Sequence, residues 1–321
     1  MGDASPSFIT LKRVSCVLLV SFTVSTTIFT EASKLKDGTY PYNTFVIPCA
    51  VEAVKLAASS AMFLRERGVR REFQNPLGFT KRDIVVYAFP AFCYFVSNNC
   101  MFYIIRYLGA STFQIMSNLK ILSTGVFMRV FLNRKLSWMQ WKALIMLVIG
   151  CMVTQLSATA HERHADERSP SAGYALVFVS IVAASVGGVF SEKILKDIKH
   201  QESNGRKYSI HWKNMQLYVF GLMFGLISLC MDATSASLPG RNLFDGFNAF
   251  AYATVATLAI CGLLVSFILK HLDNVAKCFC TALSMLCVAL LDSAMKAEII
   301  PMRVVLGIIL TGLALEQYNL S

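Results

Sequence analysis

The chain has 321 residues, of which 55% are hydrophobic and only 15% are charged. Soluble domains carry about 25% charged residues, so this composition excludes an ordinary soluble protein and predicts one that crosses a membrane several times. The net charge of +11 would suggest nucleic-acid binding in a soluble protein, but most basic residues here lie in short segments between apolar stretches, as in cytosolic loops of membrane proteins.

Ten stretches of the sequence are apolar and long enough to cross a bilayer as helices. The first could pass for a signal peptide, but no small-residue cleavage site follows it, so we expect it to be retained. Most of the ten cysteines lie inside these stretches, and disulfide bridges are therefore not expected to define the fold. The stretches cover 13–31, 43–65, 83–106, 111–133, 137–157, 171–194, 213–232, 246–269, 274–295 and 300–318.

The distribution of Lys and Arg predicts how these helices are oriented. If the segment after the first helix faces the far side of the membrane, near-side segments hold eighteen basic residues and far-side segments hold eight. The positive-inside rule then places both termini in the cytosol. The sequon Asn319-Leu320-Ser321 would also lie there, so we expect Asn319 to carry no glycan. A glycan at Asn319 would contradict the predicted orientation.

The fourth stretch carries one lysine, Lys120, about ten residues from its start. At roughly 1.5 Å per residue it lies about 15 Å into a hydrocarbon layer ~30 Å thick, where an ionised lysine costs at least ~3 kcal/mol. Phe113, Ser117 and Thr124 share its face of a continuous helix. This face could hold a phosphate beneath a stacked base; the alternative is a structural lysine neutralised by a carboxylate on a neighbouring helix.

An internal repeat runs through the sequence at an offset of 164 residues, about half the chain. Gly150 has a counterpart near Gly312, and chance similarity between apolar helices is the alternative explanation. At this offset Arg106-Tyr107-Leu108 matches Lys270-His271-Leu272, and Phe113, Ser117 and Lys120 match Lys277, Thr281 and Ser284.

Each half of the repeat holds five helices, an odd number, so the second half must be inserted upside down relative to the first. Inverted repeats of this kind build secondary transporters with a substrate site near the midplane. We predict a first repeat over 1–160, a polar luminal linker over 161–170 and a second, inverted repeat over 171–321. His161 and His164 in the linker could touch a metal, but a solvated linker explains them and we predict no metal site.

Other polar residues interrupt the apolar stretches. Glu52 and Lys55 lie on one helix face, where they form an internal ion pair, contact the substrate, or do both if Glu52 orients Lys55. The amides of Asn98 and Asn99 either join helices or recognise the edge of a base.

Glycines and amphipathic side chains offer further candidates in the second half. Gly187 and Gly188 allow close helix packing, a hinge or room for a ligand. Asn214 and Tyr218 could bind a ligand from the cytosolic side, unless Tyr218 is an interfacial anchor. Interfacial anchoring is the simplest explanation of Lys142, one turn inside its helix.

Short segments around these residues match the pattern of a known family over nearly the whole chain. They are Glu52-Ala53-Val54-Lys55-Leu56, Asn98-Asn99, Phe113-Gln114-Ile115, Leu119-Lys120-Ile121, Leu132-Asn133-Arg134, Asn214 with Gln216 and Tyr218, and Asp273-Asn274 with Lys277. The sequence resembles the nucleotide-sugar transporters of the drug/metabolite transporter superfamily, most closely the CMP-sialic acid transporter branch.

This resemblance implies ten helices in two inverted halves, a place in the Golgi membrane, and exchange of a cytosolic nucleotide sugar for a luminal nucleoside monophosphate. In the family, the positions matching Lys120 and Lys277 contact the nucleotide phosphate. Phe113 stands where relatives carry tyrosine, and Ser97 where they carry glutamine, which alters the hydroxyl and amide groups offered to the nucleotide. The positions in or near the family's site are those matching Lys55, Asn98, Phe113, Gln114, Asn214 and Tyr218.

These features predict an antiporter that works by alternating access around a central polar pocket. The expected exchange is of CMP-sialic acid, or a related CMP-linked acidic sugar, for CMP, and a UDP-sugar of the UDP-galactose type is the alternative. A membrane-embedded sugar transferase would need more carboxylates than the helix interiors offer, and the sequence holds no Walker A, GxGxxG or HExxH motif. We predict no cofactor and no nucleic-acid partner. The predicted substrate-binding residues are Lys55, Asn98, Asn99, Phe113, Gln114, Ser117, Lys120, Gly188, Asn214, Tyr218 and Lys277, with Glu52, Thr281 and Ser284 in support.

Overall fold

The computed structural model describes residues 6–36, 39–69, 81–156, 170–196, 209–231, 243–295 and 299–320. Within these ranges the chain consists of helices joined by turns and short links, without any strand, so the all-α class was predicted correctly. The helices are α1 (Pro6–Ala32), α2 (Val46–Val69), α3 (Lys81–Leu108), α4 (Ala110–Ser117), α5 (Lys120–Leu132), α6 (Trp138–Gln155), α7 (Pro170–Lys196), α9 (Ile210–Met231), α11 (Ala249–His271), α12 (Asn274–Met295) and α13 (Met302–Asn319).

Seven of the described helices are long and apolar enough to cross a membrane, in agreement with a polytopic membrane protein. They are α1, α2, α3, α7, α9, α11 and α12. The other predicted stretches are helical too, but the fourth is divided into α4 and α5, and α6 and α13 have only 18 residues each. Ten crossing helices in two inverted repeats therefore stay a prediction.

The chain forms two compact units that each draw helices from both halves of the sequence. Unit 1 consists of Met1–Phe95 and Ser191–Leu272, and unit 2 consists of Val96–Phe190 and Asp273–Ser321. Helices α3 and α7 contribute to both units. The predicted division at 1–160 and 171–321 concerns the repeat and stays a prediction, and residues 161–169 of the predicted linker, including both histidines, lie outside the described residues.

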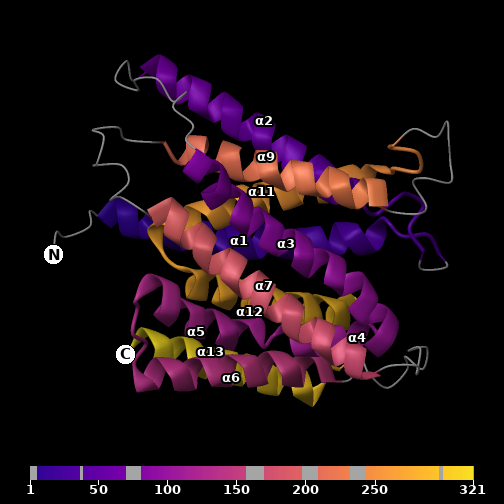
Figure 1. The fold of residues 1–321 in the computed structure, drawn as a ribbon. Coiled ribbons are helices and arrows are strands. Elements are labelled where there is room, and N and C mark those ends of the chain that lie inside the picture. Colours follow the sequence, from indigo (N-terminus) through magenta and orange to yellow (C-terminus); the bar gives the residue numbers. More distant parts are fainter. Residues whose placement is uncertain are drawn as a thin grey trace. The chain divides into compact units, whose positions relative to one another are not determined.

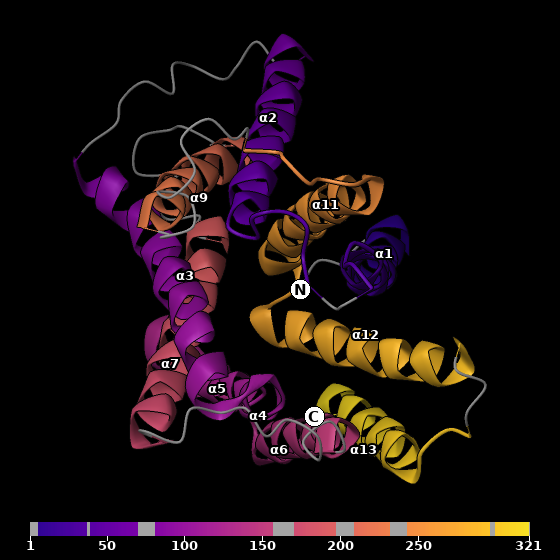
Figure 2. The ribbon, with the colours of Figure 1, turned by 90° about the vertical axis from the view of Figure 1, so that its right-hand side faces the viewer.

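In unit 1, α11 packs against both α1 and α2, and α2 also packs against α9 (Figure 2). Val51, Val255 and Ala259 are buried where α2 meets α11. At the start of α11, the Asn248 side chain accepts a backbone N–H of the first turn (2.8 Å) and donates to the carbonyl of Ser33 at the end of α1 (3.0 Å). This cap therefore satisfies a free N–H group of α11 and also ties α11 to the neighbouring helix.

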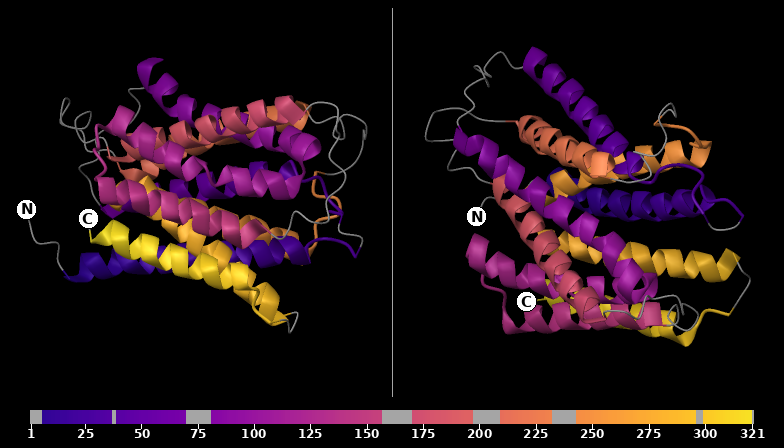
Figure 3. Two further views of the ribbon diagram at one scale, coloured as in Figure 1. Left: turned by 90° about the horizontal axis from the view of Figure 1, so that it is seen from below. Right: turned by 45° about the vertical axis from the view of Figure 1, so that its right-hand side comes forward.

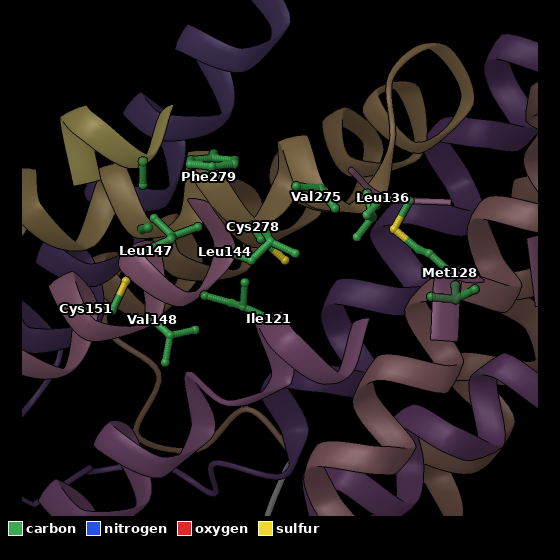
Figure 4. Close-up of a cluster of buried hydrophobic side chains, with 13 residues drawn as sticks. Ile121, Met128, Leu136, Leu144, Leu147, Val148, Cys151, Val275, Cys278 and Phe279 are labelled. Atoms are coloured by element: carbon green, nitrogen blue, oxygen red, sulfur yellow. The ribbon is translucent and has the colours of Figure 1, made fainter. Parts of the chain in front are cut away.

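In unit 2, α13 runs alongside α6, and α12 packs against α5, α6 and α13 (Figures 1 and 3). Ser137 begins α6 with a capping box, in which its side chain and that of Gln140 each accept the other's backbone N–H at 3.1 Å. Lipid is as apolar as these helices, so close packing rather than removal of water holds them together. The buried apolar cluster that joins them (Figure 4) includes Ile121, Leu144, Leu147, Val148, Cys151, Val275, Cys278 and Phe279.

The contact between α6 and α13 depends on small residues. A Cβ atom added to Gly150 would lie 3.0 Å from the Thr311 hydroxyl and 3.3 Å from the Gly307 carbonyl, and one added to Gly307 would overlap the Thr154 hydroxyl. Small residues at such positions let two membrane helices approach closely. Gly312, the predicted counterpart of Gly150, has open space around it, so that correspondence does not extend to packing.

We predict that Gly307→Ala destabilises the protein, because the new methyl group would have to displace the Thr154 hydroxyl of α6. Overpacking of this kind typically costs about 1–3 kcal/mol. Gly312→Ala is the control on the same helix, since it adds the same methyl group where no atom lies within 4 Å. The measurement is the thermal midpoint of unfolding in detergent; equal midpoints for the two variants would contradict a tight α6–α13 contact.

Candidate functional site

The helix that carries Lys120 is interrupted. The prediction of one continuous helix over 111–133 is wrong, because α4 ends at Ser117 and α5 begins at Lys120. Between them, the backbone N–H groups of Asn118 and Leu119 donate to carbonyls three residues back, at 3.3 and 3.0 Å, instead of four. Both residues keep right-handed φ and ψ angles, so the chain makes a tightened turn of the 3₁₀ type without a sharp kink.

The tightened turn changes which side chains share a face with Lys120. A 3₁₀ turn advances by about 120° per residue and an α-helix by about 100°, so α5 is rotated relative to the face that α4 presents. Within α5, Lys120 is exposed, whereas Thr124, one turn later, is only 3% exposed. Phe113 and Ser117 are half-buried, and the Ser117 hydroxyl donates to the carbonyl of Gln114 (2.8 Å).

Unit 2 brings Lys120 and Lys277 together. Lys120 is the first residue of α5 and Lys277 lies in the first turn of α12, and their ammonium groups are close enough to repel each other. Lys120 also lies near the thiols of Cys151 and Cys278. In the part of unit 2 that the structure describes, neither lysine forms an ion pair with a carboxylate. The two cations therefore stand next to each other without an internal counter-ion from this unit.

Asp273, the carboxylate four residues before Lys277, is engaged elsewhere. One of its oxygens accepts from the Arg134 guanidinium (2.5 Å), and the other accepts the backbone N–H of Ala276 in the first turn of α12 (2.7 Å). Asp273 thus caps α12 and joins it to the chain at the end of α5. In the alternative interpretation a neighbouring carboxylate neutralises the lysines, but no carboxylate among the described residues of unit 2 pairs with either lysine.

Thr281 and Ser284 continue α12 beyond Lys277. Thr281 is exposed and donates to the carbonyl of Lys277 (3.0 Å), whereas Ser284 is buried and donates to the carbonyl of Thr281 (2.8 Å). Thr281 therefore shares the accessible side of α12 with Lys277, and Ser284 lies in the packed interior.

Two predicted amide positions on α3 and α4 are accessible. Asn98 and Gln114 are exposed, and Asn99 is half-buried. Next to them, Ser97 hydrogen-bonds to Ser180 of α7, with 3.0 Å between the hydroxyl oxygens. Ser97, which departs from the family pattern, therefore joins α3 to α7.

Gly188 makes room for a protein side chain. It is buried in α7, and a Cβ atom added to it would lie 2.6 Å from the amide nitrogen of Asn274, the first residue of α12. Of the three roles considered for this glycine, the structure shows close packing of helices in unit 2.

Unit 1 holds a second cluster, built around Lys55 of α2. Lys55 pairs with Glu52 (2.5 Å) one turn earlier, and its ammonium group lies 4.4 Å from the ring centroid of Tyr218 on α9. The Tyr218 hydroxyl hydrogen-bonds to Ser266 of α11 (3.0 Å). The Glu52 carboxylate thus neutralises this cation and the Tyr218 ring holds it, in contrast to the lysines of unit 2.

Two glycines that sequence reasoning missed create the space for this pair. A Cβ atom added to Gly221 of α9 would lie 2.8 Å from the Glu52 carboxylate, and one added to Gly262 of α11 would lie 2.6 Å from the Lys55 side chain. Ser266 was also missed. Nothing in the sequence distinguishes these three small residues from others that occur in apolar helices.

Tyr218 and Asn214 lie inside unit 1. Tyr218 is only 6% exposed, so it is not an interfacial anchor. Asn214, one turn earlier on α9, is 3% exposed, and its side-chain oxygen has no hydrogen-bond partner among the described residues. A buried amide oxygen without a donor is costly, which makes Asn214 a candidate to accept a hydrogen bond from a ligand.

Comparison with known proteins identifies the family. A family model described as nucleotide-sugar transporter matches residues 7–319, nearly the whole chain. The chain belongs to the nucleotide-sugar transporter family. The resemblance drawn from the sequence motifs is therefore confirmed at the level of the family, and the lysines without a counter-ion belong to a family that transports phosphate-bearing compounds.

Relatives within this family differ in the nucleotide sugar that their names give. CMP-sialic acid transporter 1 of Arabidopsis thaliana is 30% identical over 308 residues, covering 94% of this chain and 88% of its own. CMP-sialic acid transporter 1 of Oryza sativa subsp. japonica is 32% identical over 94% of this chain and 92% of its own. UDP-galactose translocator 1 of Caenorhabditis elegans is 30% identical over 99% of this chain and 90% of its own. A solved crystal structure of a protein shares the fold with a TM-score of 0.68 at 13% identity, covering 99% of this chain and 98% of its own.

We predict that Glu52 and Lys55 stabilise the protein as a pair. Glu52→Gln and Lys55→Met should each lower the thermal midpoint, because each leaves a largely buried charge alone, and the double variant should lose less than the sum. We expect a coupling free energy of about 1–3 kcal/mol. Additive losses would contradict the pair.

The exposed pair of Glu31 and Lys34 is the control, since it has the same spacing and a similar distance (2.8 Å). Its hydrogen bond raises the pKa of Lys34, but the Glu31 carboxylate is exposed to water, so the coupling of the pair should stay below about 0.5 kcal/mol.

Proposed function

We propose that this transporter exchanges CMP-sialic acid, or a related CMP-linked acidic sugar, for CMP across the Golgi membrane by alternating access. The observation that carries the proposal is the pair Lys120 and Lys277, which repel each other and have no carboxylate partner in the described part of unit 2. An ammonium group within the membrane-spanning region needs a counter-ion. A nucleotide phosphate supplies one through charge-assisted hydrogen bonds to both lysines.

The same pair favours exchange over one-way transport. Without an anion, the two ammonium groups repel each other, which raises the free energy of the empty carrier. An empty carrier that changed state would have to do so with this repulsion unrelieved. A bound phosphate removes the cost in both directions. The nucleotide sugar and CMP both carry phosphate, so each can return the carrier for the other.

An arrangement of ten membrane helices in two inverted repeats suits this mechanism. The arrangement is supported by the helices that the structure shows in every predicted stretch. The excess of Lys and Arg on the near side supports cytosolic termini. A sugar transferase has less support, because Glu52, the carboxylate on which it would depend, is already paired with Lys55. We therefore propose a transporter without enzymatic activity.

The choice of CMP over UDP depends on the relatives and on few residues. CMP-sialic acid transporters of plants and UDP-galactose translocators of animals are about equally similar to this chain, at 30–32% and 30% identity. The resemblance of the motif residues, such as Leu119-Lys120-Ile121 and Asp273-Asn274 with Lys277, to the CMP-sialic acid transporter branch favours the cytidine nucleotide, and the UDP-sugar is the alternative.

We predict strict exchange, tested by counterflow into proteoliposomes. Uptake of labelled CMP should be fast into vesicles loaded with CMP and slow into empty vesicles or vesicles loaded with GMP or AMP, because only a bound cytidine nucleotide returns the carrier. Equally fast uptake into empty vesicles would instead indicate a uniporter or a channel. Faster exchange with internal UMP than with CMP would favour the UDP-sugar alternative.

We predict that Lys120→Ala and Lys277→Ala each weaken CMP binding by about tenfold to a hundredfold, since a charge-assisted bond to phosphate contributes roughly 1.5–3 kcal/mol. Uncharged cytidine should bind the variants almost as it binds the wild type. Arginine at either position should restore little, because its planar fork does not replace a compact ammonium. The measurement is binding affinity by calorimetry in detergent.

Lys142→Ala serves as the matched control, because Lys142 is exposed and lies over the Trp138 ring at 5.6 Å. It should leave the affinity for CMP unchanged. Equal losses of CMP and cytidine binding in the Lys120 and Lys277 variants would show that these lysines are structural.

A further inference from the structure

The turn between α4 and α5 is held by a side chain that has no part in the proposed phosphate contact. We infer that Asn118, supported by Gln155 of α6, is a positioning residue that aims Lys120 at the phosphate by keeping this turn in its tightened form. The inference rests on the proposed function, since it assumes that Lys120 binds phosphate.

The Asn118 amide takes the place of its own backbone N–H at the Gln114 carbonyl, which also accepts from the Ser117 hydroxyl (2.8 Å). In a continuous helix the Gln114 carbonyl would accept the backbone N–H of Asn118, but that N–H is bonded one residue further on, to Ile115 (3.3 Å). The Asn118 side-chain nitrogen instead lies 3.1 Å from the Gln114 carbonyl and 3.2 Å from that of Ile115. The side chain thus compensates for the altered backbone bonds, which is how Asn competes with regular helix.

Three neighbouring helices of unit 2 support the turn. The Gln155 side-chain oxygen of α6 accepts from the Asn118 amide (2.8 Å), and the Gln155 amide nitrogen lies against the sulfur of Met285 on α12 (2.7 Å). The hydroxyl of Ser185 on α7 donates to the carbonyl of Lys120 itself (3.1 Å). The backbone that carries Lys120 is therefore fixed on both sides, and Asn118 is the contact that selects the tightened form.

Loss of this contact should move the ammonium group. Three backbone bonds, from Asn118, Leu119 and Ile121, reach only three residues back. If they returned to the α-helical pattern, the start of α5 would rotate by about 20° per residue, or roughly 60° in all. Charge-assisted hydrogen bonds need a distance of about 2.7–2.9 Å, so a rotation of this size takes Lys120 away from a phosphate that Lys277 still holds.

The experiment measures CMP and cytidine affinity for Asn118→Ala, Lys120→Ala and the double variant by calorimetry in detergent. Asn118→Ala should weaken CMP binding on the order of tenfold, without changing cytidine binding, because the lysine is present but misplaced. In the Lys120→Ala background it should have no further effect, because both changes remove the same contact. A purely structural role would weaken both ligands and would add to the loss from Lys120→Ala.

Gln155→Leu is the second variant, and it keeps the test informative if Asn118→Ala does not fold. It removes the support but leaves the Asn118 amide. It should therefore weaken CMP binding less than Asn118→Ala does and should leave cytidine binding unchanged. Gln317→Leu is its control, since Gln317 makes a similar amide contact to the sulfur of Met139 (3.7 Å) elsewhere in unit 2. It should change neither affinity.

The outcomes separate the two proposals. If Lys120→Ala weakens CMP selectively but Asn118→Ala and Gln155→Leu do not, the inference is overturned and the phosphate contact stands. If Lys120→Ala binds CMP like the wild type, the phosphate contact and the inference both fail.

Discussion

Two ammonium groups held near each other, with no carboxylate partner among the described residues of unit 2, are the constraint on which the rest of that unit depends. Lys120 and Lys277 repel each other, and the nearest acidic side chain along α12, Asp273, is held by Arg134 and by the cap of its own helix. A flexible surface would let the lysines separate and find water. Here the apolar cluster behind them packs α5, α6 and α12 together and keeps both backbones in place. An anion that enters from outside would relieve the repulsion.

The two units hold their lysines in different ways. In unit 1, Lys55 is neutralised by Glu52 and covered by the ring of Tyr218, so this cluster carries hydrogen-bonding groups but no net charge. In unit 2 no carboxylate among the described residues pairs with Lys120 or Lys277. A neutral polar cluster suits recognition of a base or a sugar, whose contacts are hydrogen bonds, whereas a pair of cations suits phosphate.

The sequence predicted most of the fold, because hydrophobic length alone specifies membrane helices. It also singled out Lys120 and Lys277, since charge at depth in such helices is expensive, and the structure brings the two lysines together, while their role in binding stays a prediction. It did not predict the break between α4 and α5. That break depends on Asn118 finding Gln155, 37 positions later, and a single amide in an apolar stretch is equally compatible with a continuous helix.

The glycines that lie against polar side chains, two of them missed from the sequence, have a common physical explanation. Gly221 lies against the carboxylate of Glu52, Gly262 against the side chain of Lys55, and Gly188 against the amide of Asn274. In each case a polar side chain that has to be kept from lipid lies in the space left by a missing Cβ atom on a neighbouring helix. Without that space the helices would have to separate or the polar group would have to turn toward lipid, at a cost of several kcal/mol. The polar residue can be recognised in the sequence, but its glycine partner can be recognised only once the helices are paired.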